Sequence, residues 1–468
     1  MALWSLGALN NYTRSLPLQD GLIIPDRIIK APLLEALRPH MNSREFLPGN
    51  QVQILIRELN LLSGGATTEN VAIRTPQAGS YSLLTAPLRE IEVNVGTTMQ
   101  ALDRAEGMPG SWGKHVDDLL AERRADYDFT WDRILMNAGT GLLANVVSSS
   151  WNTDTLTVTC DNTYTQTGVE NVALIKRGMM VEVLAHGGAL VADNASVTSW
   201  QVQASTFGDR NNGAATTGSF TIKPSSDISA NVTDADFVYA KGTATATGLT
   251  FPEPMGLVAH IQGTGDGYAG VNKLTTYQGV TRASYASTNA LVWQATDFDS
   301  DGSDGTPSDW TLRTISRFLN TLGRGSGQDT PDLLLASSML AMSIMDRQRS
   351  EGGSNVVVYN TRQEAEQART VVGDRFAGQF LRPDGVMIPI RVADTIPATV
   401  LYAIKTGAYI WHTQGGFINL ASRLGLGDVW MKSPADRLTN FEAPGHEYGQ
   451  ITSLRNDRSG CIQDMLAD

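Results

Sequence analysis

Three aspartates at alternate positions have the spacing in this chain that most resembles a metal site. Asp297, Asp299 and Asp301 precede Gly302 in the segment DFDSDGSDGTPSD, the order of carboxylates and glycine that opens a calcium-binding loop. Such a loop ends with a bidentate glutamate at its twelfth position, where this chain has Ser308. We therefore favour a solvated acidic turn before a helix N-terminus, with a bound cation as the open alternative.

Two glycine patterns resemble parts of nucleotide-binding sites. Gly265, Gly267 and Gly270 spell GxGxxG after the strand-like LVAHIQ, but the following VNKLTTYQGVTR lacks the apolar period of a phosphate-binding helix. The Gly-Lys pair that ends at Lys114 lacks the spacing of a phosphate loop, and His115 replaces the Ser or Thr that would hold magnesium. We expect no bound nucleotide and no other cofactor.

The other reactive residue types are scattered along the chain. The sequence has no HxxxH, HExxH or GxSxG pattern. Its two cysteines, Cys160 and Cys461, are too few for a disulfide framework. We therefore predict no catalytic, cofactor-binding or metal-binding residues, and a protein that is not an enzyme. The histidines are His40, His115, His186, His260, His412 and His446.

Composition narrows the class of protein further. The chain has 468 residues, enough for about three domains. Its 36 basic and 48 acidic residues give a net charge of -12, which argues against a sequence-independent grip on nucleic acid over most of the surface. There is no signal-peptide pattern and no run of 18 apolar residues. We expect a soluble protein without a membrane partner.

The stretch from His115 to Gly139, HVDDLLAERRADYDFTWDRILMNAG, has the apolar spacing of a long amphipathic helix. Asp117 and Asp118 are expected in its first turn, where carboxylates oppose the positive end of the helix dipole. Gly139 is expected to be a left-handed C-terminal cap. The apolar face comprises Val116, Leu119, Leu120, Tyr127, Trp131, Ile134, Leu135 and Ala138.

Acidic residues on this helix are four apart in two pairs, Asp118 with Glu122 and Asp128 with Asp132. Like charges at that spacing destabilise an isolated helix by about 0.2 to 0.5 kcal/mol per pair, and Arg124 offsets only part of this. Either water solvates these carboxylates, or basic groups from elsewhere complete the face. Of the 36 basic residues 28 are arginine, a type that suits bidentate pairs across contacts.

The first hundred residues contain two segments that need a surface to lie on. Residues 1–50 combine five prolines with Leu- and Ile-rich runs, which excludes a long helix and is not typical of a disordered tail. Between Gln51 and Val95 the runs QVQILIREL and REIEVNV alternate apolar and polar residues, which predicts a long two-stranded projection. Because an isolated hairpin is marginal in water, either the same chain or another subunit should cover it.

The rest of the chain changes pattern twice. Residues 143–250 contain short strand-like runs between turn residues, which predicts a small inserted all-β barrel or sandwich. Residues 291–407 alternate helix and strand patterns and predict an α/β layer domain, with Ser308 and Gly323 as the N-cap and C-cap of its first helix. The predicted strands of the insertion are TLTVTC, MMVEVLA, SWQVQAS, GSFTI and DFVYA. Those of the α/β region are DLLLAS, NVVVYN, VMIPIRVAD and ATVLYAIK, and its later helices are SMLAMSIMDRQR and TRQEAEQART.

This order of segments resembles the major capsid proteins of tailed bacteriophages, which have the Hong Kong 97-type fold. The segments that carry the resemblance are ADYDFTWDRILMNAGTG, AGVNKLTTYQGVTRASYASTNALVWQAT, PDLLLASSMLAMSIMDRQR and SLRNDRSGCIQDM. The resemblance implies an α+β fold with this division: 1–50, N-terminal arm; 51–98, extended β-hairpin loop; 99–142, peripheral domain with a long spine helix; 143–250, inserted β-rich domain; 251–290, return to the peripheral domain; 291–407, axial α/β domain; 408–468, closing β segment of the peripheral domain.

The resemblance also implies a function. Copies of the chain would form hexamers and pentamers that close into an icosahedral shell around packaged double-stranded DNA, assembled in the host cytoplasm and retained in the virion. An arm and a projection that cannot bury their apolar faces alone would gain that burial on neighbours. Portal, scaffolding and decoration proteins are the further implied partners, and the enclosed DNA would not be bound sequence-specifically.

Three features qualify this expectation. The segment from Gln51 to Val95 contains no lysine, so it lacks the donor for the isopeptide crosslink found in part of the family, and we expect non-covalent reinforcement. The insertion exceeds the compact family core, and its pattern does not distinguish a brace between subunits from an exterior decoration. Because the chain begins at Met1, we expect no cleaved N-terminal scaffolding segment, and a separate scaffolding protein would fit.

Two alternative functions stay open at this point. An encapsulin-like cellular compartment would use the same fold to enclose protein cargo instead of DNA. An α/β hydrolase or oxidoreductase with a β accessory domain would belong to a different class, and it would need convergent His, Asp and nucleophile residues of which the motifs give no sign.

Overall fold

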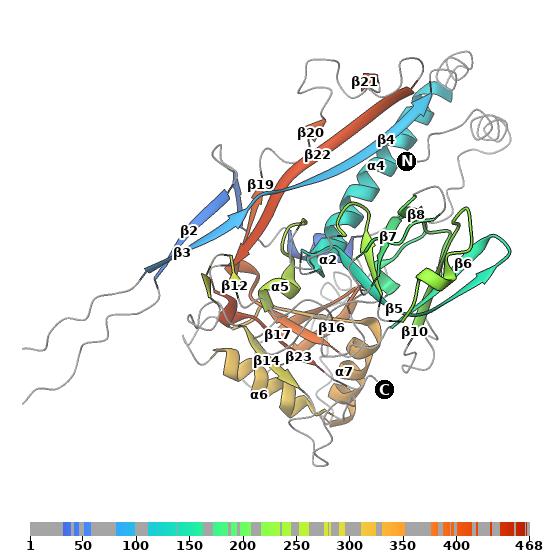
Figure 1. The fold of residues 1–468 in the computed structure, drawn as a ribbon. Coiled ribbons are helices and arrows are strands. Elements are labelled where there is room, and N and C mark those ends of the chain that lie inside the picture. The colour runs from blue at the N-terminus through green and yellow to red at the C-terminus, as the bar shows by residue number, and fades with distance from the viewer. Residues whose placement is uncertain are drawn as a thin grey trace, which may run out of the picture.

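The computed structural model of the chain is a mixed α+β fold in which sheets dominate and helices are few, as predicted (Figure 1). The described residues are 31–38, 42–45, 51–57, 81–98, 111–137, 139–161, 172–185, 189–193, 197–206, 217–234, 236–244, 252–261, 276–278, 280–281, 290–294, 310–323, 330–351, 376–381, 387–393, 395–396, 400–413, 418–419, 431–432, 440–453, 455–463 and 465.

The predicted long helix is present as α4, Ser111–Leu135. Its predicted start was wrong, because the helix begins four residues before His115 and its first turn contains no acidic residue. Asp117 and Asp118 therefore lie in the second turn, beyond the most favourable part of the dipole. The buried face agrees with the apolar spacing, since Tyr127 and Trp131 are fully buried.

Gly139 has the left-handed conformation that the sequence predicted, with φ +88°, but its role is different. It lies beyond the helix end, and a Cβ atom there would be 3.0 Å from the carbonyl oxygen of Glu253 and 3.1 Å from that of Pro254. The glycine thus permits close approach of the 252–256 segment. Arg133 of α4 and Glu253 form a buried bidentate ion pair beside this approach.

A long antiparallel ribbon lies against α4. Strand β4, Arg89–Thr98, pairs along its whole length with β22, Asn440–Ser453. The sequence had placed REIEVNV in the two-stranded projection, and this pairing corrects that prediction. Four shorter strands complete this six-stranded sheet: β1, Asn42–Glu45; β19, Tyr409–Thr413; β20, Ile418–Asn419; β21, Met431–Lys432.

The two strands of the projecting hairpin are β2, Gln51–Arg57, and β3, Tyr81–Pro87, which pair antiparallel in full register. Figure 1 shows this hairpin extending away from the body next to β4. Strand β3 was not among the strands predicted from the sequence, although the side chains of YSLLTAP alternate between the two faces of the hairpin. A small turn of the same chain, formed by β12, Thr276–Tyr277, and β13, Val280–Thr281, lies at its base.

The inserted region forms one seven-stranded sheet in the order β8-β7-β11-β5-β6-β10-β9. Its two edge strands are consecutive in the chain and are joined by Val202 and Gln203, which bond back to Met179 and Thr221 respectively. The chain therefore runs without a break from one edge of the sheet to the other and curves it toward a barrel, one of the two forms, barrel or sandwich, that the sequence left open. Its strands are β5, Leu142–Asn152; β6, Thr155–Asp161; β7, Met180–Leu184; β8, Ser199–Gln201; β9, Ala204–Thr206; β10, Thr217–Ile222; β11, Phe237–Ala240.

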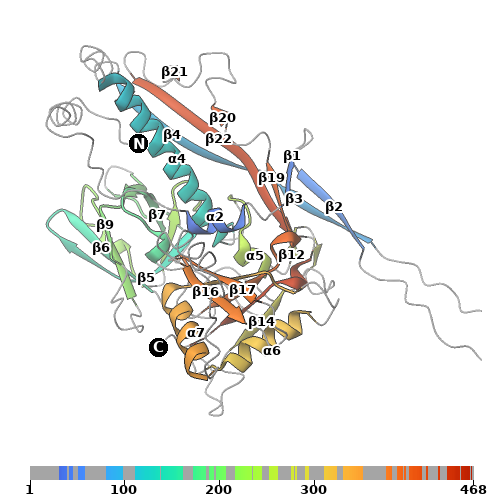
Figure 2. The ribbon, with the colours of Figure 1, turned by 180° about the vertical axis from the view of Figure 1, so that it is seen from behind.

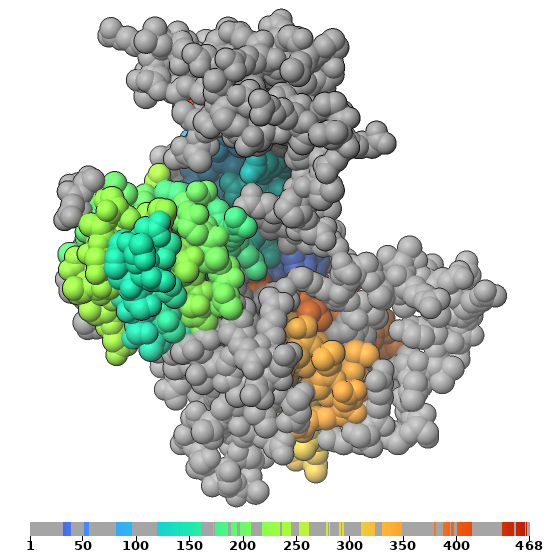
Figure 3. All heavy atoms as spheres, turned by 90° about the vertical axis from the view of Figure 1, so that its right-hand side faces the viewer, coloured from blue at the N-terminus to red at the C-terminus, as the bar shows by residue number. Residues whose placement is uncertain are grey.

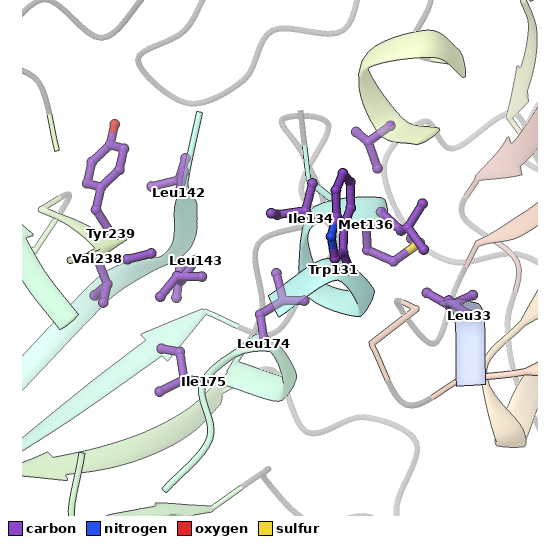
Figure 4. Packing of buried hydrophobic residues seen from close by; sticks show 14 of the residues in the cluster. Leu33, Trp131, Ile134, Met136, Leu142, Leu143, Leu174, Ile175, Val238 and Tyr239 are labelled. Carbon is purple, nitrogen blue, oxygen red and sulfur yellow. The ribbon is translucent and has the colours of Figure 1, made fainter. Parts of the chain in front are cut away.

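The five strand-like runs of this region are confirmed, and β5 is an additional strand. The inserted region forms a separate lobe in the space-filling view (Figure 3), yet its apolar interior belongs to the same core cluster as α4. Figure 4 shows Leu142, Leu143 and Leu174 of the insertion near Trp131 and Ile134 of the helix. The 3-10 turns η1, Val172–Leu174, and η2, Ser229–Asn231, pack against β5.

The third large sheet has the order β14-β23-β18-β15-β17-β16, with α6 and α7 beside it (Figure 2). Strand β15 is buried on both faces: Leu334 and Ala336 pack in a cluster with the two helices, while Leu333 and Leu335 join the core around α4. This explains the continuous apolar run DLLLAS. The bounds are β14, Leu291–Gln294; β15, Leu333–Ala336; β16, Phe376–Leu381; β17, Met387–Val392; β18, Leu401–Ile404; β23, Gly460–Gln463; α6, Leu312–Gly323; α7, Ser338–Glu351.

Two details of this region differ from the sequence prediction. Helix α6 is capped by Thr311, whose side chain accepts from the backbone N–H of Thr314 at 3.3 Å, while Ser308 lies outside the described residues. Strand β23 pairs with β14 and β18, whereas the resemblance assigned it to the closing segment of the peripheral domain. The predicted NVVVYN strand and TRQEAEQART helix, residues 355–370, also lie outside the described residues.

Four short helical elements connect these sheets. Helix α2, Pro32–Leu37, belongs to the N-terminal arm, and α5, Leu257–Ile261, is fully buried. The turns η6, Thr406–Ala408, and η7, Asn456–Arg458, precede β19 and β23. The division into seven segments remains a prediction. The third sheet combines strands from two of these segments, 291–407 and 408–468.

Candidate functional site

The motifs that could have carried chemistry do not form a described site. Asp297, Asp299 and Asp301, and the glycines of the GxGxxG pattern at Gly265 and Gly267, lie outside the described residues. The Gly-Lys pair at Lys114 lies inside α4, so its backbone is helical and cannot form a phosphate loop. Over the described ranges, no three His, Cys, Asp or Glu side chains are grouped so as to hold a metal ion.

The histidines with described side chains take part in packing and local hydrogen bonds. His412 is hydrogen-bonded to Thr452 at 2.8 Å, and the ring of His260 meets the ring of Tyr409 edge-on at 5.6 Å. His446 lies 3.6 Å from the carboxylate of Glu90. These contacts occur in different places, and Thr452, whose hydroxyl is bonded to His412, is fully buried where β19 pairs with β22.

The outer face of the β2–β3 hairpin is the most exposed apolar surface among the described strands. The register places Leu55 opposite Leu83, with Tyr81 next along the same face of β3. Their side chains are 66%, 45% and 57% exposed for Leu55, Leu83 and Tyr81 respectively. We call these three residues the outer patch. Large apolar side chains gathered on one face indicate a surface that another molecule covers.

The inner face of the same hairpin is covered by its own chain. Leu84 is fully buried and clusters with Ile54 and with Val280 of β13. The backbone N–H of Thr85 donates to the carbonyl oxygen of Gln278 at 2.7 Å, which fixes the base of the hairpin. The hairpin is therefore one-sided: this chain buries one face and leaves the outer patch open.

The N-terminal arm is anchored on its own subunit through α2. Asp132 of α4 accepts hydrogen bonds from the backbone N–H groups of Leu33 at 2.8 Å and Leu34 at 3.1 Å. These are donors at the helix N-terminus, which no local side chain caps because Ala31 occupies the N-cap position. Residues 31–38 thus follow the same-subunit alternative. Residues 1–30 lie outside the described part of the chain.

This contact answers the question that the like-charge pair on α4 raised. Asp132 is buried and bonded to backbone donors, while Asp128 remains partly exposed and pairs with Arg124 at 3.3 Å. Asp128 is thus partly solvated and paired with Arg124, whereas Asp132 is satisfied by backbone donors, which neither alternative included. Burial raises the pKa of Asp132 to about 7, although the two N–H donors and Lys176 oppose this shift.

A second buried carboxylate lies where α4 meets β22. Glu447 is fully buried and accepts hydrogen bonds from the indole N–H of Trp131 at 3.0 Å, from the hydroxyl of Thr413 at 2.7 Å, and from the hydroxyl of Tyr127. Burial raises its pKa to about 7, against the opposing effect of Arg38 and Arg124. This carboxylate ties the helix to two strands.

Only partial signals for these features are present in the sequence. The alternation in YSLLTAP could have identified β3 and its outer face, since Tyr81 and Leu83 share one parity. No local pattern marks Asp132 or Glu447 as buried, because their hydrogen-bond partners are distant in the sequence. These partners lie about 100 residues from Asp132 and about 320 residues from Glu447.

No protein-family model and no curated protein match the chain. Several solved structures are similar over nearly the whole chain. The capsid asymmetric unit of cyanophage A-1(L) matches with a TM-score of 0.48 at 11% identity, covering 96% of both chains. The capsid of a native GTA particle matches with a TM-score of 0.43 at 8% identity, covering 95% of this chain and 94% of that one.

An encapsulin structure is also similar. The holo-SrpI encapsulin complex from Synechococcus elongatus PCC 7942 matches with a TM-score of 0.39 at 9% identity, covering 100% of this chain and 97% of that one. The solved structures similar to this chain thus include the class of protein that its sequence resembles, phage capsids. Among the described helices, none combines the length and apolar character needed to cross a membrane.

Proposed function

We propose that this chain is a capsid shell protein that associates with copies of itself. The observation that carries the proposal is the one-sided hairpin, whose inner face is packed by its own chain while Leu55, Leu83 and Tyr81 stay exposed. A two-stranded ribbon is marginal in water by itself, so covering its open face would stabilise it.

A second copy of the chain is the partner that fits this geometry best. The hairpin extends away from the body (Figure 1), so its outer patch can reach a neighbour without displacing elements of its own subunit. A projection that docks on a different surface of the next copy makes a heterologous contact, and such contacts repeat into rings or larger assemblies. The binding free energies of many modest contacts of this kind add up when the assembly closes on itself.

At finer detail, we propose the arrangement that the sequence resemblance implies: hexamers and pentamers closing into the icosahedral shell of a tailed bacteriophage around packaged double-stranded DNA. The role is structural and not catalytic. Copies of the chain would be its main partners, joined by portal, scaffolding and decoration proteins. Assembly would occur in the host cytoplasm, and the product would be part of the virion.

The outer patch provides the direct test. Leu83→Asp places a charge in the centre of the patch, where burial against another subunit would be costly. We expect soluble subunits with normal secondary structure that no longer form closed particles in negative-stain electron microscopy. Leu83→Met keeps an apolar side chain of similar volume and is the matched control, which should still assemble. Normal particles from the Leu83→Asp variant would contradict the role of the hairpin.

The content of purified particles separates a phage capsid from an encapsulin-like compartment. We expect nuclease-protected double-stranded DNA inside particles isolated from the native source. Particles that contain a defined protein cargo and no nucleic acid would instead support the compartment, and they would leave the self-association proposal intact.

A further inference from the structure

We propose that residues 31–38 form a proton-controlled latch. Helix α2 is held on α4 while Asp132 carries a proton, and its docked population falls when Asp132 ionises. The latch rests on contacts within one chain, so it holds or fails independently of the proposed assembly.

The geometry makes Asp132 the polar connection between the arm and α4. One of its oxygens, Oδ1, accepts from both Leu33 and Leu34, and only 2% of the residue is exposed. The apolar side chains of α2 also hold it in place, since Leu33, Leu34 and Leu37 are all buried in the core cluster that contains Trp131. Figure 2 shows α2 beside the C-terminal half of α4.

The charged groups around Asp132 do not neutralise it. Lys176, which follows η1, favours the ionised form, and Glu35 of α2 itself disfavours it. Arg38, at the end of α2, lies 5.3 Å above the ring of Trp411 and acts on Glu447. Burial has the largest effect of all, so the pKa of Asp132 rises to about 7 when the arm is docked.

Proton linkage then fixes the direction of the switch. In the released state Asp132 would face water and titrate near its ordinary value of 3.8. A raised pKa in the docked state means that docking binds a proton, so the stabilisation is complete below 3.8, declines as pH rises above that value, and is fully lost above about 7. Acid holds the arm in place, and neutral to alkaline pH loosens it.

Hydrogen–deuterium exchange of the full chain, followed by mass spectrometry of peptides covering residues 31–38, tests the latch. The N–H groups of Leu33 and Leu34 are themselves the reporters. Asp132→Asn keeps an oxygen acceptor that cannot ionise. The pKa of Asp132 differs by about three units between the two states, so at pH 8.5 we expect this peptide to exchange about a thousandfold faster in the wild type than in Asp132→Asn. At pH 5.5 the difference should shrink to about fiftyfold, because Asp132 is already ionised in the released state there.

Controls distinguish the latch from general loosening. Asp128→Asn alters the partly exposed aspartate one turn away and should behave as the wild type does at both pH values. Peptides covering β15 should exchange equally in every variant. Equal wild-type and Asp132→Asn rates at both pH values would overturn the latch.

A second comparison needs no variant. Within the wild type, after correction for intrinsic exchange, peptides from residues 31–38 should lose protection between pH 5.5 and 8.5 relative to those from β15. An unchanged ratio would overturn the proposal even if Asp132→Asn failed to fold.

Discussion

Single residues hold the body of this molecule together through buried carboxylates. Glu447 has three donors, one each from Tyr127, Trp131 and Thr413, so its ionised form is well hydrogen-bonded. Burial nevertheless outweighs these donors, and its pKa rises from 4.5 to about 7. The Glu447 carboxylate therefore has hydrogen-bond donors, yet its ionisation still costs free energy because it is buried.

The stability of the chain should therefore depend on pH through Glu447. A raised carboxyl pKa contributes stability that is complete below 4.5 and is lost as pH rises through about 7. Glu447→Gln keeps the size of the side chain and one acceptor but cannot ionise. We expect it to reduce the change in unfolding free energy with pH by on the order of 3 kcal/mol at most. Urea unfolding of wild type and variant at pH 5 and pH 8 measures it. Equal pH dependence in both proteins would contradict the assignment.

Tyr127 offers a second test of the same carboxylate. Tyr127→Phe removes a hydroxyl that donates to the Glu447 carboxylate, so the charged form loses more than the protonated form. We expect a loss of about 1.5 to 3 kcal/mol of unfolding free energy at pH 8 and a smaller loss at pH 5. An identical loss at both pH values would show that only packing had changed.

At the scale of elements, the inserted region shares its hydrophobic core with the long helix α4. The two edges of its sheet are joined through the 199–206 segment, yet its interior is continuous with the core around Trp131 and Ile134. The lobe is thus part of the hydrophobic core and not an appendage on a linker.

Replacing residues 143–240 with a short flexible linker should consequently prevent folding of the rest. The change would expose Ile134 and Leu135, which are almost fully buried now. We expect insoluble protein, or soluble protein without cooperative thermal unfolding. A matched variant that shortens only the Asn152–Thr155 hairpin turn should remain folded. A soluble, cooperatively folding chain without the insertion would contradict the shared core.

Local patterns predicted most elements, while their pairing required the tertiary structure. The helical period located α4, and the alternating runs located β2, β4 and β7. The partner of β4 was predicted incorrectly, because β22 lies about 350 residues away and contains Pro444 and two glycines that weaken a strand signal. Asp132 looked like half of a repulsive pair, since a sequence does not show which backbone donors reach it.

The whole molecule is a body with one projecting, one-sided hairpin and an anchored arm. In the proposed assembly a neighbour that covers the hairpin would stabilise this chain, and assembly and folding would be coupled. Within the proposed assembly we expect the reinforcement of this region to be non-covalent, because the segment from Gln51 to Val95 contains no lysine to form an isopeptide bond.

Particles boiled in denaturant should therefore run as a single band near 50.4 kDa on a denaturing gel. Leu83→Asp subunits, which we expect not to assemble, are the unlinked reference. A ladder of multiples from wild-type particles alone would show covalent linkage and contradict the non-covalent reinforcement.

The most direct test of self-association is the size of the purified wild-type chain at increasing concentration, measured by light scattering after size exclusion and by negative-stain microscopy. We expect large closed particles, or rings that convert into them, once the outer patches meet neighbouring copies. A compact monomer that persists at high concentration, with Leu55, Tyr81 and Leu83 still open to water, would contradict the account.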